Sequence, residues 1–187
     1  MAVDRVEKRL KKVTAALDAA GIKYAVIGDN AVAAWVARVD PAATRSTKYV
    51  DLLVPRTEAA RLSRAMRALG FLEDDIVGVR VFIDPDEPSV RSAVHIVWAN
   101  ELVRPQQLQP APSIDESELD PQGFRVVNLA ALVRMKLTAF RLIDKVHIQD
   151  LMKMKLIDSA VRLQLPEALH KRLLEVESTF EDDLQDE

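Results

Sequence analysis

The segment KYAVIGDNAVAAW, from Lys23 to Trp35, joins an apolar run typical of a buried strand to one typical of a helix, with Gly28 between them. A strand that ends at a glycine and leads into a helix offers free backbone N–H groups and the positive end of the helix dipole, which favour a phosphate. Asn30 can donate to such an anion or cap the helix. Asp29 opposes this use, because a carboxylate repels a phosphate unless a metal ion lies between them. By itself the turn fits a nucleotide site, a former one, or a plain strand-to-helix connection.

The segment YVDLLV, residues 49–54, is predicted to be the next strand, and it carries one acid among apolar residues. Alternation along a strand places Tyr49 and Asp51 on the same face. A buried carboxylate must be paired or bound to a metal, and acids at positions i and i+2 would form a Mg²⁺ platform for phosphoryl transfer. Here only the second position is an acid. Asp51 therefore fits either a metal ligand or an acid at a sheet edge, paired with Arg45 or Lys48.

The remaining chain is divided by its hydrophobic pattern into further helices and strands. Helices are predicted over residues 6–20, 30–39 and 57–70, and strands over 71–75, 79–84 and 93–99. This order predicts an α+β (α/β) fold in which helices pack on a small sheet. Residues 1–100 form the predicted core, 101–126 a surface loop, 127–178 a C-terminal helical segment packed on the core, and 179–187 an acidic tail.

Composition excludes several classes of protein. The chain has 187 residues, 49% of them hydrophobic, and a net charge of -3, which argues against general, charge-driven binding to nucleic acid. It has no cysteine, so disulfides and thiolate metal sites are excluded. No apolar run reaches the roughly 18 residues that a membrane span needs. These features predict a cytoplasmic protein that does not contact a membrane.

Two stretches together resemble a known superfamily. YAVIGDNAVAAW and RSTKYVDLLV are similar to the nucleotidyltransferases of the polymerase-beta type, nearest the minimal and AbiE-type toxin branch. Those proteins carry a Gly-Gly or Gly-Ser turn, a helix, and then a strand with Asp-x-Asp. LVRMKLTAFRLIDKVHIQDL resembles the helical segment that follows the catalytic sheet in that branch. The likeness covers roughly residues 22–56 and 128–158, and it implies a small mixed sheet with flanking helices, followed by a C-terminal helical segment.

The resemblance assigns the core motif positions, and this sequence departs from several of them. Gly28 matches the first glycine of the turn, and Asp29 stands where a second glycine or a serine belongs. Asp51 matches the second acid of Asp-x-Asp, whereas Tyr49 replaces the first. His95 stands where related enzymes often carry a third acid. Asp84 is a less fitting substitute for that third acid.

The resemblance also implies how a metal and a nucleotide would be held. Asp51 is the expected catalytic residue and ligand of Mg²⁺, with Asp29 as a substitute ligand, whereas a phenol such as Tyr49 binds Mg²⁺ poorly. The residues expected to bind a nucleoside triphosphate (NTP) are Gly28, Asp29, Asn30, Lys48 and Lys136. Tyr49, His95 and Arg141 are further candidates for the cleft. From the residues alone, Lys136 fits a contact to a triphosphate, a pair with Asp51, or a solvated helix face.

Three functional hypotheses follow from these observations. In the first, the chain is a nucleotidyltransferase that moves NMP from an NTP to a hydroxyl of RNA, a protein or a small molecule, with catalysis impaired by Tyr49 and Asp29. In the second, it is a non-catalytic pseudoenzyme or binding module of the same fold that acts through a protein partner, as in two-component toxin–antitoxin systems. In the third, it is an unrelated small α/β protein.

Overall fold

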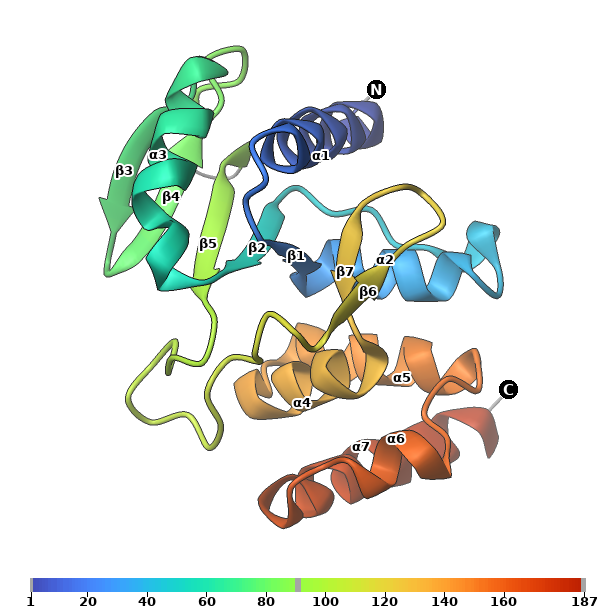
Figure 1. Cartoon of the computed structure of the whole chain (residues 1–187). Helices are drawn as coiled ribbons and strands as arrows, with labels where there is room; N and C mark the ends of the chain where they lie inside the picture. The colour runs from blue at the N-terminus through green and yellow to red at the C-terminus, as the bar shows by residue number, and fades with distance from the viewer. Residues whose placement is uncertain (1, 90–91, 186–187) are drawn as a thin grey trace.

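One mixed sheet of seven strands organises the part of the chain that the computed structural model describes, residues 2–89 and 92–185 (Figure 1). The strands are β1 (Ala25–Ile27), β2 (Val50–Val54), β3 (Leu72–Ile76), β4 (Val79–Ile83), β5 (Val94–Trp98), β6 (Ser117–Leu119) and β7 (Arg125–Val127). They lie in the order β3-β4-β5-β2-β1-β7-β6. β2 pairs with β5 and β1 with β7 in parallel, and the other neighbours are antiparallel. The predicted α+β fold with a mixed sheet is confirmed.

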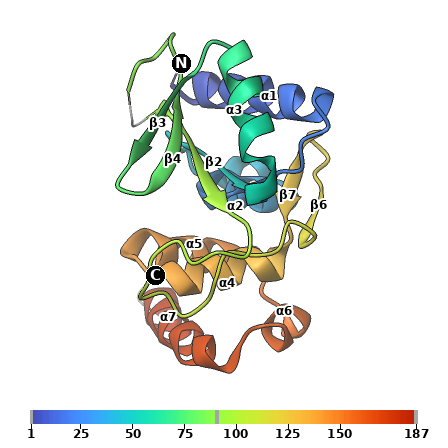
Figure 2. The same ribbon diagram turned by 60° about the vertical axis from the view of Figure 1, so that its left-hand side comes forward.

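Helices flank this sheet and then continue beyond it. They are α1 (Ala2–Ala19), α2 (Gly28–Ala37), α3 (Ala59–Ala68), α4 (Leu129–Ala139), α5 (Leu142–Lys153), α6 (Ser159–Leu163) and α7 (Glu167–Gln185), with 3-10 turns at Pro41–Ala43 and Arg56–Glu58. α1 contacts α3 and β2, whereas α2 contacts β1 and β2 as well as α4 and α5. Figure 2 shows α4 to α7 gathered on one side of the sheet. In the described part of the chain, a helix of the length and apolarity needed to cross a membrane is absent.

The central strand β2 is buried on both faces, which explains its almost uninterrupted apolar sequence. Its side chains Val50, Leu52, Leu53 and Val54 are all fully buried. Asp51 is the one polar member of the strand and is only partly buried. The sheet therefore holds this carboxylate rigidly in the middle of the molecule, between β1 and β5.

The prediction of a surface loop over residues 101–126 is wrong in its second half. That stretch contains β6 and most of β7, and Val126 pairs with Val26 of the central strand β1. Phe124 and Val126 are buried in the core. Strands of only three residues are too short to show a period of two, so sequence alone does not separate them from a loop.

The predicted acidic tail over residues 179–187 is helical over most of its length. Helix α7 continues without interruption through this region as far as Gln185. Residues 186 and 187 of the predicted tail lie outside the described residues.

The pairing of β7 with β1 makes Val126 a core residue, which a stability measurement can test. We expect Val126→Ala to lower the free energy of unfolding by about 2 kcal/mol, because it removes buried methyl groups and leaves a cavity. Leu119→Ala is the matched control, since Leu119 lies in the same hairpin and is exposed. We expect that variant to stay within about 0.5 kcal/mol of the wild type in urea unfolding. Equal effects of the two substitutions would contradict the placement of β7.

Candidate functional site

A cleft of about 880 Å³ lies between the sheet and the helices α4 and α5. Its volume is in the range of sites that hold small molecules. Strands β1, β2, β4 and β5 form one wall, the two helices face them, and residues between 103 and 111 complete the lining. Of the residues singled out in the sequence, the lining includes Gly28, Asp29, Tyr49, Asp51, His95, Lys136 and Arg141. The fold thus gathers most of the predicted site residues in one place.

Gly28 lets the turn between β1 and α2 pass directly over Asp51. The register of the two strands pairs Ile27 with Asp51, so Gly28 follows immediately beyond this pair. Gly28 has a φ of +66°, a conformation that favours glycine. A side chain at this position would also bring its Cβ to 2.3 Å from Oδ2 of Asp51. Both constraints require a glycine here, independently of any ligand.

Asp51 and His95 form a hydrogen-bonded pair that lines the cleft. The parallel register of β2 and β5 sets the two residues side by side, and Nδ1 of His95 lies 3.2 Å from Oδ1 of Asp51. The Tyr49 ring packs against the His95 ring with their centroids 5.2 Å apart. The Asp51 side chain remains 24% exposed. It is therefore a carboxylate that a ligand in the cleft can reach.

Lys136 is a buried cation that links α4 to both α2 and α5. Its side chain is only 4% exposed. Its Nζ lies 2.9 Å from Oδ1 of Asp29, 2.9 Å from Nδ1 of His147 and 3.3 Å from Oδ1 of Asp144. A buried ammonium group requires such partners, because leaving it without them costs several kcal/mol. Lys136 therefore neutralises the acid of the glycine turn, and it does not pair with Asp51.

The partners of Lys136 are held in fixed ionisation states. Burial and the neighbouring charge of Lys136 lower the pKa of His147, so its ring is neutral near pH 7 and Nδ1 can accept a hydrogen bond from the ammonium group. Burial by itself would raise the pKa of Asp144, but the hydrogen bond from Arg141 and the charge of Lys136 outweigh it, and the pKa is lowered. The hydrogen bond to Asp144, assisted by the charges of Asp29 and Asp51, raises the pKa of Arg141.

Asp144 and His147 were not selected from the sequence as site residues, although a signal was present. They are spaced by three residues in LIDKVHIQDL and so share one face of α5. Both are almost fully buried. Buried polar residues with helical spacing predict a partner inside the molecule, but the sequence does not tell that this partner is Lys136.

Three sequence predictions are not supported by the geometry. Asn30 donates from Nδ2 to the backbone carbonyl of Tyr49 at 2.6 Å, so it fastens α2 to β2 and does not line the cleft. Lys48 is exposed and lies outside the lining. Asp84 accepts a hydrogen bond of 3.0 Å from buried Arg9, far from the role of a third acid. Asn30 and Asp84 are held by these hydrogen bonds, and Lys48 faces solvent.

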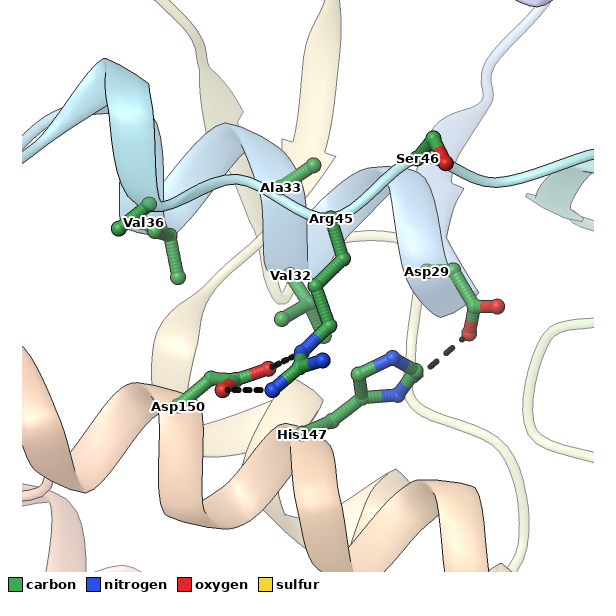
Figure 3. Close-up of a pocket in the computed structure, with 9 residues that line it drawn as sticks. Asp29, Val32, Ala33, Val36, Arg45, Ser46, His147 and Asp150 are labelled. Atoms are coloured by element: carbon green, nitrogen blue, oxygen red, sulfur yellow. Dashed lines mark hydrogen bonds and ion pairs between the residues drawn. The ribbon is translucent and has the colours of Figure 1, made fainter. Parts of the chain in front are cut away.

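The predicted partnership of Asp51 with Arg45 is also wrong. Arg45 donates through Nε and Nη2 to the two carboxylate oxygens of Asp150 on α5, with Nη2 3.0 Å from Oδ1. Figure 3 shows this pair beside a second contact, in which His147 of α5 points towards Asp29 at the start of α2. The segment after α2 is thereby held against α5, and the N-terminus of α2 is tied to the same helix.

Comparison with solved structures shows which fold this is. No protein-family model and no curated protein sequence matches the chain. The solution structure of the antibiotic-resistance factor ANT(2'')-Ia matches all of both chains with a TM-score of 0.60 and 16% identity. A nucleotidyltransferase-like antigenic protein of Paracoccidioides brasiliensis matches 97% of this chain and 94% of its own, with a TM-score of 0.56 and 16% identity.

The chain has the nucleotidyltransferase fold. A crystal structure of ANT(2'')-Ia in complex with adenylyl-2''-tobramycin adds a match over 95% of this chain and 97% of that one, with a TM-score of 0.53 and 15% identity. These neighbours share the fold that the resemblance of the glycine turn and YVDLLV implies. Gly28, Asp51 and His95 also line one cleft, an arrangement that the two nucleotidyltransferase-fold hypotheses require and that the hypothesis of an unrelated fold does not.

The donor set of this nucleotidyltransferase fold does not fit a pair of Mg²⁺ ions. Such a centre needs several carboxylates that face the same point. Here Tyr49 and His95 flank Asp51, and Oδ1 of Asp29 accepts from Lys136. Among the described residues, no group of three or more His, Asp or Glu side chains is arranged to hold a metal ion. The described lining therefore offers too few free carboxylates for a pair of Mg²⁺ ions.

The lowered pKa of His147 predicts how stability changes with pH. As the pH falls below about 6.5, the unfolded chain takes up a proton that folded His147 does not bind, so folding stability falls. His147→Asn keeps an acceptor near Lys136 but cannot titrate. We expect its stability to fall less steeply than that of the wild type between about pH 6.5 and 5, as measured by urea unfolding.

The exposed histidine provides the control for this comparison. His170→Asn should follow the wild-type pH profile, because His170 is exposed on α7. Parallel profiles for the wild type and His147→Asn would contradict the assignment of a neutral, buried imidazole beside Lys136.

Proposed function

We propose that this chain is a binding protein built on the nucleotidyltransferase fold, and that it does not catalyse metal-dependent nucleotidyl transfer. The observation that carries this proposal is the ammonium group of Lys136, which lies 2.9 Å from Asp29. To act as a substitute metal ligand, Asp29 would have to exchange the ammonium group of Lys136 for a metal ion. With Tyr49 in place of an acid, Asp51 is then the only carboxylate of the described cleft lining that does not contact a lysine or arginine.

Electrostatics supports this proposal. Metal-dependent transfer uses the cations both to neutralise the triphosphate and to activate the attacking hydroxyl. A single carboxylate rarely holds Mg²⁺, because the ion gives up its hydration water reluctantly. In a metal-dependent site, the carboxylate binds the phosphates through the metal ion. Without that ion, Asp51 would repel the phosphates. The cleft is open to a ligand, but its charges oppose the usual chemistry of the fold.

A second candidate function is an active but weakened nucleotidyltransferase, which would move NMP from an NTP to a hydroxyl of RNA, a protein or a small molecule. The observation that favours it is the pair of Asp51 and His95, 3.2 Å apart in the cleft, which has the composition of a general base. The requirement for Mg²⁺, the AbiE-type branch and a protein partner from a toxin–antitoxin pair stay predictions from the sequence.

A transfer assay distinguishes the two functions. The protein is incubated with each α-³²P-labelled NTP, with Mg²⁺ or Mn²⁺, and with RNA, protein or small-molecule acceptors. We expect no transfer above the level of Asp51→Asn, because the metal site lacks ligands. Asp74→Asn is the matched control, since Asp74 is an exposed acid on β3.

The result against the proposal is equally specific. Transfer by the wild type and by Asp74→Asn that disappears in Asp51→Asn would establish the enzyme. In a further arm, Tyr49→Asp combined with Asp29→Gly restores the residues that the resemblance implies. Activity gained only in this double variant would identify the wild type as a degenerate enzyme of the fold.

A further inference from the structure

We propose that the cleft binds an organic ligand with a protonated amine and an apolar body, and that the amine binds Asp51. This inference rests on the proposed function, because it concerns what a cleft of this fold binds when it holds no metal. Three features of the site carry it: a carboxylate with no lysine or arginine in direct contact among the described residues, an apolar wall beside it, and a volume suited to a small molecule.

The first feature is the distribution of charge at the inner end of the cleft. Asp29 and Asp144 are matched by Lys136 and Arg141, with contacts of 2.9 Å and 2.7 Å respectively. Among the described residues, no lysine or arginine lies within ion-pair distance of Asp51, whose partner is His95. Asp51 is therefore the carboxylate of the described lining that has no lysine or arginine in direct contact, although the charge of Arg141 acts on it from a longer distance.

The other two arginines of the lining, Arg172 and Arg104, are engaged elsewhere or exposed. Arg172 donates to the backbone carbonyls of Leu137 and Thr138 at 2.7 Å and 2.9 Å, so it is committed to the C-terminal end of α4. Arg104 is exposed on the segment that follows β5. Neither makes an ion pair with Asp51.

The second feature is the apolar surface close to this carboxylate. Val79 and Val81 of β4 and Val97 of β5 line the cleft from the sheet, and Leu132 and Met135 of α4 line it from the opposite side. This surface would bury hydrocarbon at roughly 25 cal/mol per Å² removed from water. It offers nothing to a phosphate or a polyhydroxylated ligand.

The carboxylate itself can accept an additional donor. Oδ1 of Asp51 accepts from His95, but an ionised carboxylate has about four lone-pair sites on its two oxygens. Tyr49 lines the cleft beside it, and the face of an aromatic ring attracts an ammonium group. An ammonium ion therefore finds here an acid, a phenol ring and an adjoining hydrocarbon wall, whereas a triphosphate without metal would be repelled.

A matched set of probes tests this inference. 4-Phenylbutylamine, 4-phenylbutanol and 4-phenylbutyrate share one apolar body and differ in the charge of the head group. They are titrated into ¹⁵N-labelled protein at about pH 8, where imidazole groups are largely neutral. We expect the amine to shift the amide signals of Gly28 and Asp51 and to bind about tenfold more tightly than the alcohol, with the anion weakest.

Variants decide which residue is responsible. Asp51→Asn should bring the amine to the affinity of the alcohol, and Asp74→Asn should leave it unchanged. Val79→Lys introduces a cation into the cleft wall, so it should weaken the amine and strengthen the anion. This second variant keeps the test decisive if Asp51→Asn does not fold.

Two results would overturn the inference: equal binding of amine and alcohol, or tighter binding of the anion or of metal-free ATP to the wild type. The transfer assay tests the proposed function, and its result does not depend on the result of the amine titration. Amine binding together with Asp51-dependent transfer would overturn the proposed function and leave the amine site in place. An absence of both would leave the proposed function standing and remove the amine site.

Discussion

A single buried ammonium group, that of Lys136, connects the parts of this molecule. It reaches Asp29 at the start of α2 and His147 and Asp144 on α5. A buried charge is tolerated only with partners in place, so the three helices are bound to one arrangement. Because α2 begins at the glycine turn, this arrangement also fixes where the turn lies relative to Asp51. The site and the packing of the C-terminal helices are thus consequences of the same interaction.

Under the proposed function, the same interaction holds the acids of the cleft together without a metal ion. In a metal-dependent site, divalent ions hold mutually repelling carboxylates together. Here Lys136 and Arg141 do so from within the chain, and the carboxylates of Asp29 and Asp144 need no further cation. These ion pairs hold the site together, and they leave few free carboxylate oxygens that could bind a metal ion. Asp51 is left without a lysine or arginine in contact among the described residues, bound to His95 and beside an apolar wall.

The sequence predicts the parts of this site that depend on local structure. The strand–glycine–helix segment marks Gly28 as a turn, and alternation in YVDLLV places Tyr49 and Asp51 on one face. These local patterns predict the three residues as site residues. The resemblance places His95 at the position of a third acid, and the parallel pairing of β2 with β5 brings it beside Asp51. Lys136 is a site candidate because the resemblance places a lysine there and because its neighbours in the sequence are apolar.

The parts that the sequence did not predict depend on contacts between distant segments. The partners of Lys136 are set by the packing of α2 on α5, and no periodicity encodes that contact. Asn30 and Lys48 carry donors that could bind a nucleotide. In the structure, however, Asn30 donates to the carbonyl of Tyr49 and Lys48 faces solvent. β6 and β7 are too short to produce a strand pattern.

The central claim, that Lys136 stands where a metal would be needed, is tested most directly by a Mn²⁺ titration. Mn²⁺ broadens the amide signals of residues near its binding site, so a ¹H–¹⁵N spectrum locates the ion without any assay of activity. The account predicts that the signals of Gly28, Asp29 and Asp51 broaden no more than those of exposed acids such as Asp74. Selective broadening at Gly28 and Asp51 that disappears in Asp51→Asn would contradict it.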